Sequence, residues 1–598
     1  MWKMPKDKAP SGGWEQHILG LVRYIEGNEG FTKRNEKLKE QRDRRFRRHA
    51  PQIPEEYKKT AAEFRSPFIF DILRRAPGLT SAEHPTPKVI PISAGSDAQE
   101  NSSKKEKWLK HAYRRMDKGG QTYNKIIDAM VADGMAVWRV IVDKHTWAVG
   151  RRKKDESSDD YLTRVKEHHK ANFPFVWEQV PGDTVYPFYD EKGLEKVLVI
   201  TTDSGARLAK KFHLGYNADG EWVFGGEGDN PPPETARFIE YWDRDTFGYM
   251  IDNTLVKVGD HDYGQVPFFF ASLGDTSAPN VEDQNFGLGW PLMPLQDYED
   301  SMMTMLANSA YWTAFPTPTL EPVGDNQVAP DEDEQNVTVE HIVGKLQVPP
   351  MGFKYGWMVP PALGIDAMRL LEWVKGQMDR IGLAPVLFGE VGKDVASATQ
   401  QTAIAVAKSI MAPGLKNVSL GFNDMAHMML RMVEKLGKDG VPIWVTGGPK
   451  GEWLVLTPKD VKGYYEVEHT AEPIIPAEQH MKYMYLADAN QKGLIDKNKV
   501  REDGMNITDP EDMELKVMLE NARQSPAYQQ KLQEEWLRQH EENAGAGAAV
   551  PAVGAAMPPP ANTPMTPGGP NSMGAPGLNM GMQPGGPVAA RAQGQGRG

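Results

Sequence analysis

Two helical patterns of apolar residues bracket a proline-rich excursion in the middle of the chain, and few folds accommodate this arrangement. Apolar side chains recur every three or four positions over residues 292–309 and again over residues 365–381. Pro291 suits the first turn of the first helix, and Pro316 ends it. Prolines, acidic residues and short β-prone runs fill the segment between them. We therefore predict two long helices that enter and leave a small excursion.

The chain before this pair changes from helical to β-rich. Residues 1–115 are predicted to be helices separated by loops, and apolar helical faces continue to Val131. The sequence then switches to "AVWRVIV", which is typical of a strand. Over residues 136–274, short β-prone runs are split by Gly, Asp and Pro turns, a spacing that predicts an antiparallel sheet rather than βαβ units. These runs are "FPFVWEQV", "KVLVITT", "EWVFG", "RFIEYW", "TLVKVG" and "VPFFFASLG".

Beyond the second helix of the pair, the sequence predicts a glycine-containing loop and two further helices, over residues 395–411 and 418–436. The last of these carries a methionine-rich stripe on one face. Apolar side chains at this spacing are typical of a helix packed into a core, so we interpret the stripe as core rather than as a cofactor site. The stripe consists of Val418, Phe422, Met425, Met429, Met432 and Leu436.

The last part of the chain is predicted to begin with β-prone runs after Val441 and to continue as helix to about residue 542. Residues 544–598 contain no Asp, Glu or Lys and are dominated by Ala, Gly, Pro and Met. Such a segment cannot bury enough apolar surface to offset its ordering entropy. We therefore predict a disordered tail after an α+β, mainly helical chain.

Composition excludes several kinds of chemistry. The 598 residues include no cysteine, which rules out disulfides, thiolate zinc sites and cysteine nucleophiles. No secretion signal or membrane span is expected, because no long uncharged apolar run is present. The net charge of −12 disfavours general nucleic-acid binding. Residues 33–48 are strongly basic and residues 330–335 acidic, and each is interpreted as a solvated face or an arm.

The glycine-containing loop lacks the residues of a nucleotide-binding loop. A P-loop has the pattern G-x-x-x-x-G-K-[ST] after a strand, because backbone amides and a hydroxyl hold the phosphates and magnesium. Here the spacing from Gly389 to Gly392 is too short, and a helix precedes the loop. Asp394 replaces the hydroxyl, and Glu390 would repel phosphate. We interpret the segment as a flexible loop rather than an ATP site.

Other catalytic patterns are equally weak. The glycines of "FGLGWPL" lack a third glycine and a preceding βαβ strand. His168 and His169 are adjacent and so cannot form an i, i+4 metal pair. Carboxylate pairs are too common on surfaces to indicate catalysis; examples are Asp243 with Asp245, and Glu299 with Asp300. We therefore expect no enzyme activity, no cofactor and no metal site.

Two long stretches are similar to the stem region of a known family. They are "FGLGWPLMPLQDYEDSMMTMLANSAYWTAFPTPTL", from residue 286, and "LEWVKGQMDRIGLAPVLFGEVGKDVASATQQTAIAVAKSIMAPGLKNV", from residue 371. Weaker similarity lies in "FRSPFIFDILRRAPGLTSAEHPTPKVIP" and "ANQKGLIDKNKVREDGMNITDPEDMELKVMLE". With the order of the predicted elements, these segments resemble the portal proteins, or head-to-tail connectors, of tailed double-stranded DNA bacteriophages.

The resemblance implies a portal fold with wing, stem, clip and crown, assembled as a ring. It implies the following segments: 1–63, an N-terminal basic arm or helical segment; 64–287, a wing, helical and then antiparallel β; 288–314, the first stem helix; 315–361, the clip; 362–382, the second stem helix; 383–396, the tunnel loop; 397–440, wing and crown helices; 441–543, the crown and C-terminal helical region; 544–598, the disordered tail.

The resemblance also implies a function and a set of partners. The ring, dodecameric in this family, would occupy one capsid vertex of the virion after assembly in the host cytoplasm. Double-stranded DNA would pass nonspecifically through its channel during packaging and ejection. The clip would bind the terminase large subunit and later a head-completion or tail adaptor protein. The wing would face the major capsid protein and scaffold, and no membrane is involved.

Site residues follow from the same resemblance. In the tunnel loop, Val386, Gly389, Glu390, Gly392 and Lys393 are expected to line the DNA channel; alternatively, Lys393 lies at a subunit interface opposite Glu390 or Asp394. Acidic residues of the clip are expected to meet terminase or the adaptor: Asp331, Glu332, Asp333 and Glu334. An acidic channel wall with few cations would let duplex DNA slide, because a basic wall would bind its phosphates.

Two other functions remain open. The chain suits another phage head or tail ring or structural component through which no DNA passes. A metal-independent hydrolase is a more distant alternative.

Overall fold

The computed structural model describes most of the chain up to residue 501 and scattered positions after it. The described residues are 10, 13–49, 63–79, 84–117, 119–217, 220–225, 230–274, 278, 280–314, 317–322, 353–358, 365–382, 397–445, 451–471, 476–497, 500–501 and separate positions between 513 and 534. The chain divides into two compact units, Met1–Glu520 and Asn521–Gly598. The tail predicted over residues 544–598 lies outside the described residues.

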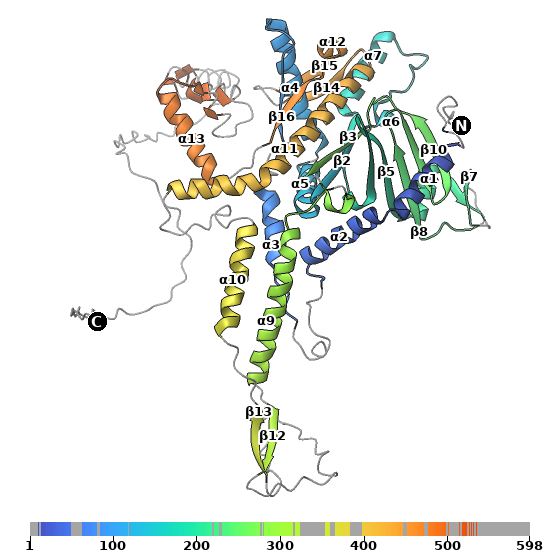
Figure 1. Cartoon of the computed structure of the whole chain (residues 1–598). Coiled ribbons are helices and arrows are strands. Elements are labelled where there is room, and N and C mark those ends of the chain that lie inside the picture. Colours follow the sequence, from blue (N-terminus) through green and yellow to red (C-terminus); the bar gives the residue numbers. More distant parts are fainter. Residues whose placement is uncertain are drawn as a thin grey trace, which may run out of the picture. The chain divides into compact units, whose positions relative to one another are not determined.

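The first unit combines helices with several antiparallel sheets, in agreement with the predicted α+β class (Figure 1). The largest sheet has the strand order β10-β9-β8-β5-β4. All of its pairings are antiparallel, as the short β-prone runs predicted. Its strands are β4 (Val185–Asp190), β5 (Gly193–Ser204), β8 (Thr235–Trp242), β9 (Thr246–Ile251) and β10 (Thr254–Asp260).

Both faces of this sheet are covered. Helix α1 (Gly13–Gly27) packs its apolar side on one face, where Ile18 contacts the core that includes Ile239 and Tyr241. Helix α8 (Gly205–Phe212) and the small β6–β7 sheet cover the other face, with Phe238 in the shared core. The two cores lie on opposite faces of the sheet because successive side chains of β8 point to opposite sides. The two strands of the small sheet are β6 (Leu214–Tyr216) and β7 (Trp222–Phe224).

A second, three-stranded sheet has the order β11-β2-β3 and packs against helices. Its strands are β2 (Met135–Val142), β3 (Phe175–Val180) and β11 (Phe268–Ser272). The helices around it are α4 (Ser96–Met116), α5 (Gln121–Asp133) and α11 (Ser397–Lys435). The helical faces predicted from Trp108 to Val131 are buried here, and the methionine-rich stripe lies in the same core. Both predictions are confirmed.

The prediction of two separate helices over residues 395–411 and 418–436 is wrong. A single helix, α11, contains Pro413. A proline inside a helix costs about 3 kcal/mol. Met411, Leu415 and Val418 are all buried on the two sides of it, and burying each such side chain contributes about 1.5–3 kcal/mol. Core packing therefore carries the helix through the proline, and Figure 1 shows that α11 bends along its course, as proline helices do.

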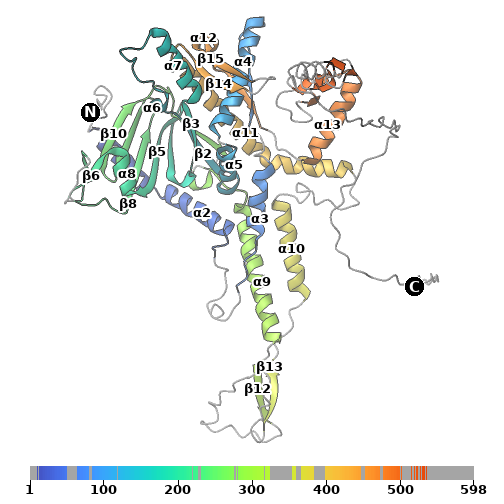
Figure 2. The ribbon, with the colours of Figure 1, turned by 180° about the vertical axis from the view of Figure 1, so that it is seen from behind.

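The two long helices around the proline-rich excursion form where predicted. They are α9 (Met293–Ala314), which follows a short 3-10 turn containing Pro291, and α10 (Ile365–Ile381). The two helices lie side by side (Figures 1 and 2). Beyond them, β12 (Thr317–Pro322) pairs antiparallel with β13 (Phe353–Met358). This hairpin brings together the two ends of the excursion.

The other elements complete the first unit. The β-prone runs predicted after Val441 form three strands, and the last of them pairs with β1 (Thr86–Val89), which lies far away in the sequence. Sequence patterns missed β1, β4 and β9, which have six residues or fewer, and the helices α7 (Ser158–Ala171) and α8, the second of which has only eight residues. The remaining elements are α2 (Glu29–Arg45), α3 (Phe68–Arg75), β1 (Thr86–Val89), α6 (Lys144–Trp147), α7 (Ser158–Ala171), β14 (Val441–Val445), β15 (Glu452–Leu456), α12 (Pro458–Val461), β16 (Val467–Thr470) and α13 (Pro476–Gln491).

A buried histidine joins three of these elements. The Tyr113 hydroxyl donates to Nε2 of His469 at 2.8 Å, and Nδ1 of His469 lies 2.8 Å from Oδ1 of Asn423. The two contacts assign the ring proton to Nδ1. Burial lowers the pKa of His469 to about 3. The imidazole is therefore neutral in the folded chain.

This histidine should make stability fall with decreasing pH. In the unfolded chain His469 is protonated below its ordinary pKa of about 6.5. In the folded chain it remains neutral until the pH falls to about 3. Between pH 6.5 and 5 the histidine should cost about 2 kcal/mol of unfolding free energy. His469→Gln should remove that part of the slope in denaturation measured across pH. The exposed control His145→Gln should keep it, and equal slopes in the two variants would contradict the assignment.

Candidate functional site

The residues predicted to act on DNA or on partners lie outside the described residues. This applies to the whole tunnel loop, residues 383–396, with Val386, Gly389, Glu390, Gly392 and Lys393, and to the clip residues Asp331, Glu332, Asp333 and Glu334. The structure describes the elements that flank them. Helix α10 ends and α11 begins on the two sides of the loop, and the β12–β13 hairpin bounds the clip segment.

The described part of the candidate site is the first half of α9 and the N-terminal segment that packs on it. Gln296, Asp300 and Thr304 are spaced by four residues, so they share one face of the helix, and all three are buried. Each bonds the chain around Ser66. Asp300 accepts from the Ser66 amide, Gln296 donates to the Ser66 carbonyl, and Thr304 accepts from the Phe64 amide.

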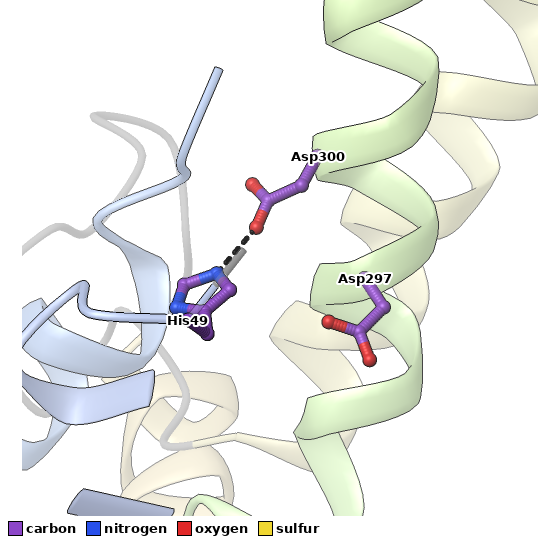
Figure 3. Close-up of side chains that lie close together, drawn as sticks. All are labelled: His49, Asp297 and Asp300. Atoms are coloured by element: carbon purple, nitrogen blue, oxygen red, sulfur yellow. Dashed lines mark hydrogen bonds and ion pairs between the residues drawn. The ribbon is translucent and has the colours of Figure 1, made fainter. Parts of the chain in front are cut away.

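A histidine and an arginine complete this arrangement. Nε2 of His49 lies 2.8 Å from Oδ2 of Asp300, and Figure 3 shows Asp300 and Asp297 on successive turns of α9, on the side where His49 lies. The Arg44 guanidinium donates to both oxygens of Asp297. We call Arg44, His49, Ser66, Asp297 and Asp300 the α9 clasp. It fastens α9 to two separate stretches of the N-terminal chain.

The clasp contains the one group of potential metal ligands found among the described residues. One ligand atom each from His49, Asp297 and Asp300 lies within 4.8 Å of the others. The two carboxylates are already engaged, since Arg44 neutralises Asp297 and two donors bind Asp300. Within the three side chains, only Nδ1 of His49 lacks a partner among the described residues. Burial raises the pKa of Asp297, and the Arg44 charge opposes this. A divalent cation would lie beside the guanidinium charge, so the arrangement fits an intrachain ion-pair network better than a metal centre.

The basic stretch over residues 33–48 is not a free arm in the structure. Most of it forms α2, whose last turn is rich in arginine. Arg42 bonds Asp133 at 2.7 Å and Asp183 at 2.9 Å, and Arg45 bonds Asp128. Burial lowers the pKa of Arg42, but its bonds to the two carboxylates outweigh burial and raise it. The carboxylates that pair with this helix lie about 80 to 250 residues away in the sequence, so no local pattern could indicate these ion pairs.

The histidines and carboxylates set aside earlier have structural roles. The His169 ring stacks on Trp147 at 3.7 Å, and His168 bonds the Thr146 carbonyl. Asp243 accepts from the amides of Asp245 and Thr246 and so shapes the turn between β8 and β9. Of the pair Glu299 and Asp300, only Asp300 belongs to the α9 clasp. Its contacts with His49 and Ser66 could not be predicted from any local pattern.

The α9–α10 pair also leaves large apolar side chains in solvent. Helix α10 buries Leu371, Val374 and Met378 within the chain's own core, yet the side chain of Trp373 on the same helix is 57% exposed. Six such side chains lie on the two helices: Tyr298, Met305, Met368, Leu370, Trp373 and Ile381. Exposed apolar side chains of this size are frequent on surfaces that another protein covers.

No protein-family model matches the sequence, and no curated protein matches it. Among the described helices, none joins enough length to enough apolar content to cross a membrane.

Proposed function

We propose that this chain is a portal protein that forms a closed ring at one vertex of a bacteriophage capsid. The observation that carries the proposal is the α9–α10 pair, which buries some of its side chains in the chain's own core and leaves six large apolar side chains exposed. Identical subunits close into a ring through a head-to-tail interface, in which two different faces meet. Trp373 and the exposed methionines suit such an interface, since aromatic residues and Met are enriched there.

The remaining features agree with this role. The hairpin at the end of the α9–α10 pair holds the ends of the clip segment together, and that segment carries the acidic residues 331–334. We propose that it binds the terminase large subunit and then a head-completion or tail adaptor. The wing would meet the major capsid protein and scaffold. The α9 clasp would keep the stem at a fixed position relative to the wing.

Double-stranded DNA would pass through the channel of this ring. The net charge of −12 supports weak contact, because affinity for duplex DNA grows with the number of phosphates that cations neutralise. The proposed role needs no catalytic residue in the chain, and ATP hydrolysis would belong to the terminase. The protein would assemble in the host cytoplasm and remain in the virion.

The proposal predicts that the purified chain forms rings and that Trp373→Arg prevents them. A charge at this exposed position would be buried without a partner on assembly, which costs several kcal/mol at each interface. Native mass spectrometry and negative-stain images would measure ring yield. The control Leu162→Arg changes an equally apolar, 45% exposed residue on α7 and should leave the rings intact.

Three results would contradict parts of this proposal. A monodisperse wild-type monomer would exclude the ring. Rings without an open axial channel would favour the alternative, another phage head or tail ring component through which no DNA passes. ATP hydrolysis by the purified chain would show that it has a catalytic site after all.

A further inference from the structure

A cleft of about 560 Å³ lies where α4, the end of α7 and the β14–β15 hairpin meet. Its lining combines cationic and aromatic side chains: His111, Arg114, Arg115, Lys170, Trp444 and Trp453. No carboxylate is among the described residues that line it. This composition contrasts with the acidic balance of the whole chain. It is typical of a site for an anionic group joined to an apolar one.

The aromatic part of the cleft is built by the hairpin. Trp444 of β14 lies directly opposite Trp453 of β15, and their rings meet edge to face with centroids 5.3 Å apart. Gly451 makes room for the first ring, since a Cβ atom there would lie 2.5 Å from Trp444. Trp444 nevertheless remains 43% exposed. The hairpin thus holds a large apolar surface in place at the mouth of the cleft.

The cationic part is held by the end of α7. Arg115 donates to the carbonyls of Lys170 and Ala171, both at 3.1 Å, and so joins α4 to α7. Burial lowers the pKa of Arg115. The Lys170 ammonium lies 5.5 Å from the centre of the Trp453 ring, and this side chain forms no ion pair within the described chain. Positive charge is therefore set beside the tryptophans without a carboxylate lining the cleft.

We propose that this cleft binds an acidic peptide segment of another protein, in which carboxylates flank an apolar or aromatic residue. The carboxylates would pair with the cations, and the apolar residue would cover Trp444. Trp and Arg are the residue types that most often dominate binding energy at protein interfaces. The site goes beyond the proposed ring and does not depend on it.

A peptide fits this cleft better than a nucleic acid does. Single strands also stack their bases on tryptophan, but their affinity depends on many phosphate contacts along a basic groove. The cleft offers only a few cations at one place, on a chain whose net charge is negative. A few cations at one place are enough to pair with the carboxylates of a short acidic peptide.

Fluorescence anisotropy on the full-length protein tests the proposal. The probes are a fluorescein-labelled peptide of sequence Glu-Glu-Trp-Glu-Glu, the same peptide with lysine in place of glutamate, and a labelled oligothymidylate. We expect the acidic peptide to bind and the lysine peptide not to bind. Lys170→Glu should weaken binding at least about fivefold, whereas the control Lys166→Glu, exposed on the same helix, should change it less than about twofold.

A second pair of variants tests the aromatic half. Trp444→Ala should weaken binding of the acidic peptide at least about tenfold. Leu162→Ala, an exposed apolar control, should leave binding unchanged. Lys170→Glu changes an exposed side chain, so it keeps the test valid even if Trp444→Ala disturbs the hairpin. Equal affinity in Lys170→Glu and Lys166→Glu would overturn the proposal. Tighter binding of the oligothymidylate than of the acidic peptide would overturn it in favour of a nucleic-acid site.

Discussion

Replacing Phe422 with alanine should lower the free energy of unfolding by about 3–5 kcal/mol. Phe422 is fully buried on α11, at the point where α4, α5 and the three-stranded sheet meet. Five rings surround it, with centroids between 5.4 and 5.9 Å away: Tyr113, Tyr123, Trp138, Trp177 and His469. These rings belong to rigid elements and cannot collapse into the space. The variant would therefore keep a cavity.

Chemical denaturation of Phe422→Ala, followed by the near-ultraviolet signal of the surrounding tryptophans, would measure this loss. The matched control is Leu420→Ala, because Leu420 lies two residues away on the same helix and is 51% exposed. It should cost less than about 1 kcal/mol. A cost as small in Phe422→Ala as in the control would show that this core is not packed as described.

Removing the carboxylate of Asp300 should have a comparable effect, about 2–6 kcal/mol, because two buried donors lose their acceptor and each such loss costs about 1–3 kcal/mol. Asp300 is fully buried and accepts from the Ser66 amide and from the His49 ring. In Asp300→Ala both donors would remain in the interior without an acceptor. The N-terminal segment should then separate from α9 more readily.

Hydrogen exchange of the Ser66 amide gives a readout specific to the α9 clasp. It should accelerate in Asp300→Ala, together with a lower midpoint of denaturation. The control Asp379→Ala removes an exposed carboxylate from α10 and should change neither quantity. Unchanged exchange at Ser66 would mean that the carboxylate does not hold the segment.

Local patterns predicted the elements whose own apolar period is strong. The α9 and α10 helices, the methionine-rich face of α11 and the strands predicted from the β-prone runs of residues 136–274 are all present. For α10, α11 and the strands, the period of 3.6 or 2 records which face is buried. Helix α9 differs, because it buries the polar Gln296, Asp300 and Thr304 and exposes Tyr298 and Met305 of its apolar stripe. The excursion between α9 and α10 was predicted from its prolines, which do not continue a helix.

The candidate site was predictable only in part. The resemblance predicted a tunnel loop and a clip, but the site residues expected in them lie outside the described part of the chain. The α9 clasp escaped detection, since Asp297 and Asp300 look like ordinary helix surface until Arg44, His49 and Ser66 meet them. The cleft escaped for the same reason, because its lining comes from α4, α7 and the β14–β15 hairpin.

By itself, the sequence determined the class of the fold, the order of its main elements and the absence of cysteine chemistry. Only the tertiary structure decided that α11 continues through Pro413, because the burial of Met411 and Leu415 outweighs a lost hydrogen bond. It also decided that the arginines of α2 form internal ion pairs. Periodicity reports how one segment divides between core and solvent. Partners drawn from segments hundreds of residues apart leave no local signal, because the contact energies that fix them exist only once the chain is folded.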